Sequence, residues 1–320
     1  MVDWKENKMN EKIIYDQLSF CLTETDFKKF GQKYVGKVRD CYRIDDDRLM
    51  LITSDRLSCF DRVVTSIPFK GQILNKMAIH WLTKAKDILP THFISSPHPN
   101  VTIGKAANAL AVEVVVRGYV TGSAWKDYCD GKSISGVTLP KGLKKNQKLE
   151  SPIITPSTKA AKGEHDQPIS ESEITSTGLV SSVLWSHVRE SALKLFEMGT
   201  KYANEQGLIL VDTKYEFGLY RGELILIDEI HTLDCSRYWI ADEYKTRFES
   251  NQEQAMLDKQ MVREWLLSQG FSGDGPIPHF DDARRVEISK YYMNSYKLIT
   301  GAEFIAIPGD PIHAIENIRF

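Results

Sequence analysis

Three charged side chains alternate along one predicted strand in the second half of the chain. Asp212, Lys214 and Glu216 stand two residues apart, directly after an apolar run at 208–211. Because strand side chains alternate between two faces, all three should point the same way. Two carboxylates and an ammonium group on one face of a buried hairpin are costly unless they hold a ligand or a metal. The ordinary structural explanation is a solvated strand face with cross-strand ion pairs.

A further carboxylate lies on the second strand of the same predicted hairpin. This strand, at 223–230, follows a turn at 220–222, and Asp228 comes directly after an apolar run at 224–227. A carboxylate in this place can reach Mg²⁺ bound to a nucleotide phosphate. Asp228 is therefore a candidate metal ligand, with Glu216 on the adjoining strand as the second.

Two glycine-containing segments are candidates for binding anions. Gly36 and Lys37 lie in a predicted hairpin, where glycine lets a phosphate approach the backbone and lysine adds positive charge. Arg117 ends a predicted strand, and the backbone amides around Gly122 and Ser123 can form an anion nest at a helix start. The ordinary explanations are a bulge glycine beside an exposed lysine and a plain strand-to-helix turn.

Two polar loops can also bind substrate groups. Residues 53–61 combine hydroxyls and acids, and residues 155–166 combine three hydroxyls, two lysines and a His-Asp pair. A helix N-cap by Ser54 or Asp55 is the ordinary explanation of the first loop. The eight histidines show no metal-ligand spacing such as HExxH, and the chain has no GxSxG, Walker or GxGxxG pattern.

The elements that must position these residues follow from hydrophobic periodicity. The pattern predicts strands at 33–44, 49–54 and 112–116, helices at 71–89, 180–202, 253–269 and 281–300, and long loops over 130–175. Mostly antiparallel strands come first along the chain, and a mixture of helices and strands follows. This order predicts an α+β enzyme of two lobes with a boundary near residue 116.

Composition excludes several classes of protein. The chain has 320 residues, 42% hydrophobic and 26% charged, which is typical of a globular protein long enough for two lobes. A net charge of −2 gives no electrostatic reason to expect a nucleic acid or an anionic membrane as partner. Five scattered cysteines without a CxxC pair fit a reducing cytoplasm. No secretory signal and no transmembrane helix are expected.

Six segments, in order, resemble the phosphoribosylaminoimidazole-succinocarboxamide synthase (SAICAR synthase) family of de novo purine synthesis. They are GKVRD at 36–40, SDRLSCFD at 54–61, EVVVRGYVTGSAWKDY at 113–128, TPSTKAAKGEHD at 155–166, DTKYEFG at 212–218 and IDEIHTLDCSRYW at 227–239. The likeness is greatest to the longer form of the family, which carries the TPSTK insertion. It implies an α+β, two-lobe fold similar to the ATP-grasp and protein-kinase nucleotide folds, with a cleft between lobes. Residues 1–115 would form a mostly antiparallel β lobe covering ATP, and residues 116–320 a mixed α/β lobe with the substrate and metal residues.

The resemblance implies a ligase that joins CAIR, the carboxylated aminoimidazole ribonucleotide, to L-aspartate while ATP is split to ADP and phosphate. A carboxylate is a poor electrophile because its charge repels an incoming amine. Transfer of the γ-phosphoryl group would convert it to an acyl phosphate, which an amine can attack. Such a transfer needs positioning and charge neutralisation rather than a protein nucleophile.

The resemblance also implies the roles of individual residues. The residues expected at the ATP phosphates are Gly36, Lys37, Val38 and Arg39, and those whose backbone meets the adenine are Ala109 and Glu113. Glu216 and Asp228 are expected to hold Mg²⁺. The residues expected around CAIR are Arg117, Ser123, Asp212, Lys214 and Arg237, with Asp61 reaching its ribose or amino side. Ser157, Thr158 and Lys159 are expected to help close over aspartate, and the expected catalytic residues are Lys37, Asp212 and Lys214.

Departures from the family pattern are small. Cysteines 41, 59 and 235 replace aliphatic or small residues, His231 stands where an apolar residue is expected, and Leu233 where proline is expected. None of them is a proposed ligand. The sequence leaves the oligomeric state open, with a monomer favoured.

Two other functions compete with this interpretation. A protein kinase on a similar fold would need HRDxxxxN and DFG, which are absent, and another carboxylate–amine ligase would lack RGYVTGSAW together with DCSRYW. A non-catalytic ligand-binding protein would be expected to lack Lys37, Glu216 or Asp228, all of which are present.

Overall fold

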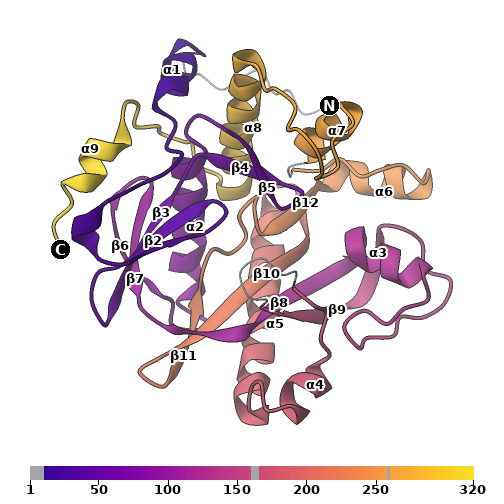
Figure 1. Cartoon of the computed structure of the whole chain (residues 1–320). Coiled ribbons are helices and arrows are strands. Elements are labelled where there is room, and N and C mark those ends of the chain that lie inside the picture. The colour runs from indigo at the N-terminus through magenta and orange to yellow at the C-terminus, as the bar shows by residue number, and fades with distance from the viewer. Residues whose placement is uncertain (1–10, 160–165, 258–259) are drawn as a thin grey trace. The chain divides into compact units, whose positions relative to one another are not determined.

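Figure 1 shows the computed structural model of the chain, which describes residues 11–159, 166–257 and 260–320. The strands are β1 Lys33–Val35, β2 Arg39–Arg43, β3 Arg48–Thr53, β4 Arg56–Cys59, β5 Arg62–Ser66, β6 Phe93–His98, β7 Val101–Lys105, β8 Asn108–Val120, β9 Gln147–Thr158, β10 Leu208–Tyr220, β11 Glu223–Ile227 and β12 Ser236–Ile240. The α-helices are α1 Glu11–Gln17, α2 Lys70–Ala85, α3 Gly122–Cys129, α4 Glu171–Ser176, α5 Ser182–Glu205, α6 Ala241–Glu249, α7 Gln260–Ser268, α8 Asp282–Thr300 and α9 Pro311–Glu316. None of the helices in these described ranges is long and apolar enough to cross a membrane.

The chain divides into two compact units. The described residues of the first unit lie within 1–80, 93–106 and 259–320, and those of the second within 81–92 and 107–258. This division differs from the single boundary predicted near residue 116, because that position lies inside β8, all of which belongs to the second unit. Helix α8 belongs to the first unit because Ser289 donates a hydrogen bond to the Pro68 carbonyl (2.7 Å) and Arg285 donates one to the Ser66 hydroxyl (2.9 Å).

The first unit contains a five-stranded antiparallel sheet in the order β1-β2-β3-β7-β6 and a separate β4–β5 hairpin. The predicted strand at 33–44 is in fact two strands, β1 and β2, joined by a turn in which the Gly36 amide donates to the Arg39 carbonyl (2.8 Å). Alternate apolar residues such as Met50 and Ile52 point to the core of this unit and are fully buried. The hairpin that carries Gly36 is therefore built on a packed sheet.

The second unit is organised around two long neighbouring strands, β8 and β10. Its antiparallel sheet has the order β11-β10-β8-β9, and β12 also pairs with β10. Helix α5 packs against this sheet (Figure 1). The Phe196 ring lies beside Gly118, and Gly199 lies beside Leu210. The helix covers one face of β10, which leaves the other face for the charged residues.

Several of the predicted elements are confirmed, but two segments were predicted wrongly. The helix predicted at 253–269 corresponds only to α7, and residues 253–257 are not helical. The helices predicted at 71–89, 180–202 and 281–300 correspond to α2, α5 and α8. The segment 130–175, predicted as loops, contains the twelve-residue strand β9 and the helix α4. Pro152 and Pro156 weaken the strand signal of β9, but β9 is an edge strand, where a residue without an N–H is tolerated.

Candidate active site

The charged row on β10 lies on one face of the strand, as predicted. In the ladder between β10 and β8, Asp212 pairs with Arg117. Glu216, two residues after Lys214, pairs with Glu113. The Lys214 ammonium donates a hydrogen bond to Glu216 (2.8 Å), so the two side chains point to the same side. Because Asp212 and Glu216 are buried, the row is not a solvated strand face.

Lys214 is the centre of a cluster of ionised side chains. Its Nζ also donates to Glu113 Oε1 (2.8 Å), and Lys159, just beyond β9, donates to the other carboxylate oxygen of Glu216. Burial opposes the charge on Lys214, but Glu216, Asp228 and Glu113 outweigh it and raise the lysine pKa above its ordinary value. Burial likewise opposes the charge on Glu216, but the two lysines hold its pKa well below the usual range. Lys214 and Glu216 are therefore both charged near neutral pH.

Glu113 differs from Glu216 in its electrostatics. Burial raises the pKa of the Glu113 carboxyl, the nearby Glu216 charge adds to this effect, and Lys214 offsets only part of it. The sequence assigned Glu113 a backbone role at the adenine, whereas its side chain contacts Lys214. The two carboxyls on either side of Lys214 thus differ in proton affinity, with Glu216 the stronger acid.

Asp228 comes directly after β11, as predicted. The last residue of that strand, Ile227, pairs with Glu216, so the two proposed metal ligands lie on adjoining strands. Asp228 has a positive φ of 64°, and its charge contributes to the raised pKa of Lys214. Mg²⁺ is commonly held by one or two carboxylates together with substrate phosphates and water. Across the described ranges no group of three or more His, Cys, Asp or Glu residues is placed to hold a metal. Two carboxylates alone would need oxygens of a substrate phosphate and of water to complete the coordination of Mg²⁺.

Arg117 and Arg237 flank Asp212 from the two neighbouring strands. Arg117 Nη1 donates to Asp212 Oδ2 (3.1 Å), and Arg237 Nη1 lies 3.5 Å from the same oxygen. Arg117 also donates from Nε to the Thr155 hydroxyl (2.9 Å) and from Nη2 to the Ser123 hydroxyl (3.4 Å). One carboxylate between two guanidinium groups leaves a net positive charge, which favours an anionic ligand.

Gly122 begins α3 directly beside the Arg237 guanidinium. Its φ is +58°, and a Cβ at this position would lie 2.7 Å from Arg237 Nη1. Any other residue would therefore push the guanidinium away and strain the backbone. Gly122 and Ser123, at the start of the eight-residue helix α3, thus lie beside Arg237 and Arg117, an arrangement suited to an anion at a helix start.

In the first unit, the predicted phosphate hairpin is fixed by a residue that the sequence analysis did not single out. Arg56 donates to the carbonyls of Gly36 (3.0 Å) and Lys37 (2.9 Å) and to the Asp40 carboxylate (2.9 Å). Lys37 itself is exposed and pairs with Asp61 at 2.6 Å. Asp61, which is expected at the ribose or amino side of CAIR, pairs in the structure with the lysine of the phosphate hairpin.

The residues proposed for aspartate lie at the end of β9. Ser157 pairs with Glu113 and Thr158 with Val112, so both are next to the strand that carries the charged cluster. Of the three, Lys159 joins that cluster through Glu216. The rest of the TPSTKAAKGEHD segment from 160 to 165 lies outside the described residues. Thr155 was also overlooked as a partner of Arg117, although it belongs to the same motif.

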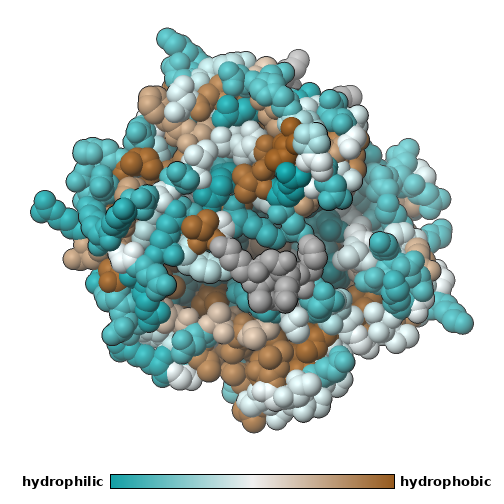
Figure 2. All heavy atoms as spheres, viewed as in Figure 1, coloured by the Kyte–Doolittle hydropathy of each residue, from teal (hydrophilic) through white to brown (hydrophobic). Residues whose placement is uncertain are grey.

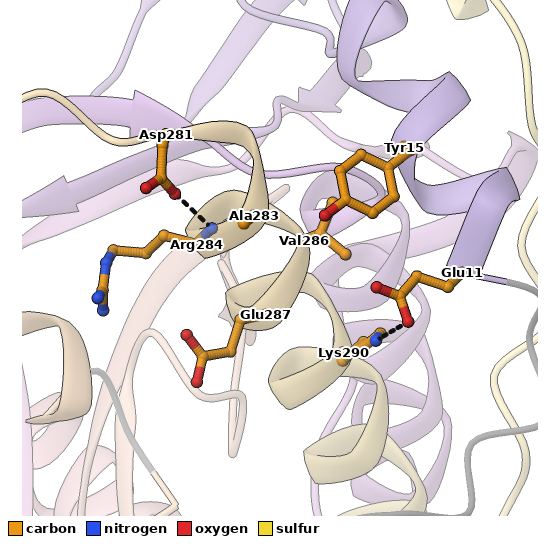
Figure 3. A pocket seen from close by; sticks show the side chains of 8 residues that line it. All are labelled: Glu11, Tyr15, Asp281, Ala283, Arg284, Val286, Glu287 and Lys290. Atoms are coloured by element: carbon orange, nitrogen blue, oxygen red, sulfur yellow. Dashed lines mark hydrogen bonds and ion pairs between the residues drawn. The ribbon is translucent and has the colours of Figure 1, made fainter.

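The surface around these elements is mainly polar. On the face shown in Figure 2, hydrophilic residues predominate, and hydrophobic residues gather in the lower part of the view, over α4 and α5. Figure 3 shows a different hollow, of about 330 Å³, which lies in the first unit between α1 and the start of α8. Two of its polar contacts are internal: Glu11 pairs with Lys290 (2.5 Å), and Asp281 caps α8 through the Arg284 amide (2.8 Å). The residues that line this hollow include none of the predicted site residues.

Comparisons with known proteins agree with the motifs. The sequence model of the family described as SAICAR synthetase matches residues 32–275. A phosphoribosylaminoimidazole-succinocarboxamide synthase of Bacteroides fragilis is 46% identical over 290 residues, which cover 89% of this chain and 92% of the relative. The solved structure of SAICAR-synthase from Saccharomyces cerevisiae, complexed with SAICAR, has a TM-score of 0.79 and 31% identity, and the match covers 88% of this chain and 99% of that one. A solved SAICAR synthetase in complex with ADP has a TM-score of 0.65 and 27% identity, with 86% and 100% covered. The chain described here therefore belongs to the SAICAR synthetase family.

Proposed function

We propose that this protein joins CAIR to L-aspartate to give SAICAR, with ATP split to ADP and phosphate. The observation that carries the proposal is the charged face of β10, where Lys214 lies between Glu113 and Glu216, and Asp212 lies between two arginines. The relatives support the substrates: the yeast structure contains SAICAR, and another family structure contains ADP. We further propose that the reaction uses Mg²⁺ and that individual residues have the roles given below.

The residues assigned to the nucleotide are Gly36, Lys37, Val38 and Arg39 at its phosphates and Ala109 and Glu113 at its adenine. Glu216 and Asp228 would hold Mg²⁺, which supplies charge neutralisation at the ATP phosphates when it is bound. We propose accordingly that the first unit covers ATP and that the second carries the metal and substrate residues.

CAIR is assigned to the end of the charged row on β10 where Asp212 lies between Arg117 and Arg237. Arg117, Arg237 and the start of α3 are suited to an anionic group of CAIR, because they combine two guanidinium groups with helix amides. Ser123 and Asp212 hold Arg117 in place, and Asp61 is retained as a contact to the ribose or amino side. Ser157, Thr158 and Lys159 are assigned to aspartate.

The chemistry proposed for these groups has two steps. A carboxylate oxygen of CAIR attacks the γ-phosphorus of ATP, the bond to the β-phosphate oxygen breaks, and ADP leaves. The aspartate amine then attacks the carbonyl carbon of the acyl phosphate, inorganic phosphate leaves, and the nitrogen loses a proton to give the amide. Lys214 and Lys37 act by neutralising charge on the transferring group, which is the main demand of phosphoryl transfer.

Purified protein tests the substrate assignment directly. With ATP, Mg²⁺, CAIR and L-aspartate all present, we expect ADP and SAICAR to form in equal amounts, and leaving out CAIR or aspartate should abolish full turnover. Equal turnover with glutamate or ammonia in place of aspartate would contradict the assignment. The scattered cysteines suggest that the reaction takes place in the cytoplasm, and we propose a monomer as the working form.

A further inference from the structure

His231 is a fully buried histidine three residues after the proposed metal ligand Asp228. The family resemblance leads one to expect an apolar residue at this position, where this chain has an imidazole. Its Nε2 lies 2.6 Å from the Tyr215 hydroxyl, and its Nδ1 has no hydrogen-bond partner among the residues that the structure describes. Burial lowers the pKa of His231 to about 3, so the ring is neutral near pH 7. Either its Nε2 or the Tyr215 hydroxyl donates the hydrogen bond between them, depending on the tautomer.

Two tyrosines hold His231 from two strands. Tyr215 on β10 bonds its ring, and Tyr238 on β12 donates to its backbone carbonyl at 2.8 Å. Tyr215 stands between Lys214 and Glu216 in the strand, so its side chain points to the opposite face, toward the core. In this short piece of β10, Lys214 and Glu216 therefore face the proposed ligand-binding side, and Tyr215 between them contacts His231.

The space for the imidazole is provided by a glycine in the middle of α5. A Cβ on Gly199 would lie 2.4 Å from His231 Cε1 and 2.8 Å from its Nε2. The Trp81 ring packs against the imidazole edge-to-face with ring centres 4.9 Å apart. A glycine inside a helix is unfavourable by about 1 kcal/mol relative to alanine, and the close approach of His231 explains its presence here. The ring is thus confined on several sides as well as hydrogen-bonded.

The segment from Asp228 to His231 has an unusual backbone that needs such support. Both of these residues have positive φ, 64° and 54°, which L-residues adopt infrequently. A hydrogen bond from the Thr232 hydroxyl to Glu229 (2.7 Å) is a further local restraint. Without outside contacts, a segment with two residues in this region would relax toward commoner conformations and move the Asp228 carboxylate.

We propose that His231 is a positioning residue for the metal site: held by Tyr215 and Tyr238, it fixes residues 228–231 against β10 so that the Asp228 carboxylate stays beside Glu216. This inference rests on the proposed function, in which these two carboxylates hold Mg²⁺ with the nucleotide. It assigns His231 no contact with substrate. Its effect is on the geometry of the two ligands.

The test is the binding of ADP measured by calorimetry, once with Mg²⁺ and once with EDTA. The ratio of the two affinities reports the metal site, and a residue that only stabilises the core would not change it. We expect His231→Leu and Tyr215→Phe each to lower this ratio about 10-fold, as is typical when a group that orients a metal ligand is removed. Because both remove the same hydrogen bond, the double variant should lose no more than either single one. His231→Gln, which can still bond Tyr215, should keep most of the ratio.

Tyr244→Phe is the matched control, since it removes a tyrosine hydrogen bond to the Asn146 carbonyl (3.0 Å) elsewhere in the same unit. Asp228→Asn separates this inference from the proposed function. If Asp228→Asn leaves the ratio unchanged, the metal assignment itself is wrong. A different result overturns the inference. In it, Asp228→Asn lowers the ratio to about one, so that Mg²⁺ no longer strengthens ADP binding, while His231→Leu and Tyr215→Phe keep the wild-type ratio. His231 is then only a core residue. Tyr215→Phe keeps the ring volume and carries the test if His231→Leu fails to fold.

Discussion

At the scale of single residues, the site depends on charges that are buried together. A lone buried lysine would lose its proton, but Lys214 is kept charged by the carboxylates around it, and Glu216 is kept charged by Lys214 and Lys159. Such a cluster is expensive to build and sensitive to the loss of one member. It is therefore weak evidence for stability and stronger evidence for a site that handles charge.

The first prediction concerns Asp228. Asp228→Asn keeps the shape of the side chain and removes its charge, so the fold should persist while ADP formation falls at least about 100-fold, the scale of losing a group that stabilises transition-state charge. Melting temperature and ATP turnover are measured on the same protein. Asp242→Asn, an exposed acid in the first turn of α6, is the control and should change neither. Near-normal turnover of Asp228→Asn at limiting Mg²⁺ would remove Asp228 from the metal site.

The second prediction concerns Arg237. Its guanidinium lies against Gly122 and shares Asp212 with Arg117, so Arg237→Ala should weaken CAIR binding by about 10- to 150-fold, the equivalent of about 1.5–3 kcal/mol for a charge-assisted hydrogen bond. ATP affinity should change much less. Calorimetry with each ligand distinguishes the two, and Arg189→Ala, at an exposed ion pair with Glu171, is the matched control. A larger loss for ATP than for CAIR would show that Arg237 has another role.

At the scale of elements, β10 explains why the charged row is rigid. One of its faces presents Asp212, Lys214 and Glu216, while the other is packed against α5. Its neighbours β8, β11 and β12 then supply Arg117, Asp228 and Arg237 at positions set by the ladder register. The proposed site residues are thus positioned on strands or directly at a strand end, which limits their movement.

The third prediction tests how α5 and the turn after β11 fit together. Gly199→Ala improves helix propensity but places a methyl group into His231, so it should lower stability by about 1–3 kcal/mol, as overpacked cores do. In a His231→Ala background the ring is absent, and the same substitution should be neutral or stabilising. Thermal unfolding of the four proteins measures the coupling. Equal effects of Gly199→Ala in both backgrounds would show that the glycine is not required by the histidine.

The fourth prediction concerns pH and the phosphate hairpin. Burial opposes ionisation of Asp40, but hydrogen bonds from Thr25 and Arg56 and the ion pair with Lys33 hold its pKa below the ordinary value. A carboxyl with a lowered folded pKa stabilises the protein above its unfolded pKa of about 3.9, and this contribution is lost as pH falls through the folded value. Asp40→Asn should therefore destabilise the protein at pH 7, and the difference from wild type should shrink toward pH 3. A difference that stays constant between these pH values would contradict this account.

The sequence predicted the elements whose signals are local and missed those that depend on the sheet. The helix α5 has a clear apolar period, and the charged row on β10 follows from strand alternation, so both were predicted correctly. The strand β9 was missed because its Pro, Ser and Lys residues resemble a loop, and only its place at the sheet edge makes it a strand. The ion pair between Glu113 and Lys214 needs the β8–β10 register, which a single sequence does not reveal.

At the scale of the whole molecule, each of the two units carries its own group of proposed site residues. The first unit carries the hairpin around Gly36, fixed by Arg56, and the second carries the charged face of β10. Helices α7, α8 and α9 belong to the first unit, so the chain returns to this unit after completing the second. A substitution that removes the hydrogen bond from Ser289 to Pro68 or from Arg285 to Ser66 is therefore expected to lower the stability of the first unit. It should leave the binding of CAIR unchanged.

The most direct test of the central claim follows an oxygen atom. CAIR is prepared with oxygen-18 in its carboxylate and converted with ATP and aspartate, and the released phosphate is examined by mass spectrometry. If the carboxylate is activated as an acyl phosphate, one labelled oxygen leaves with the phosphate in each turnover, and the other remains in the amide of SAICAR. Unlabelled phosphate accompanying normal SAICAR formation would contradict the account.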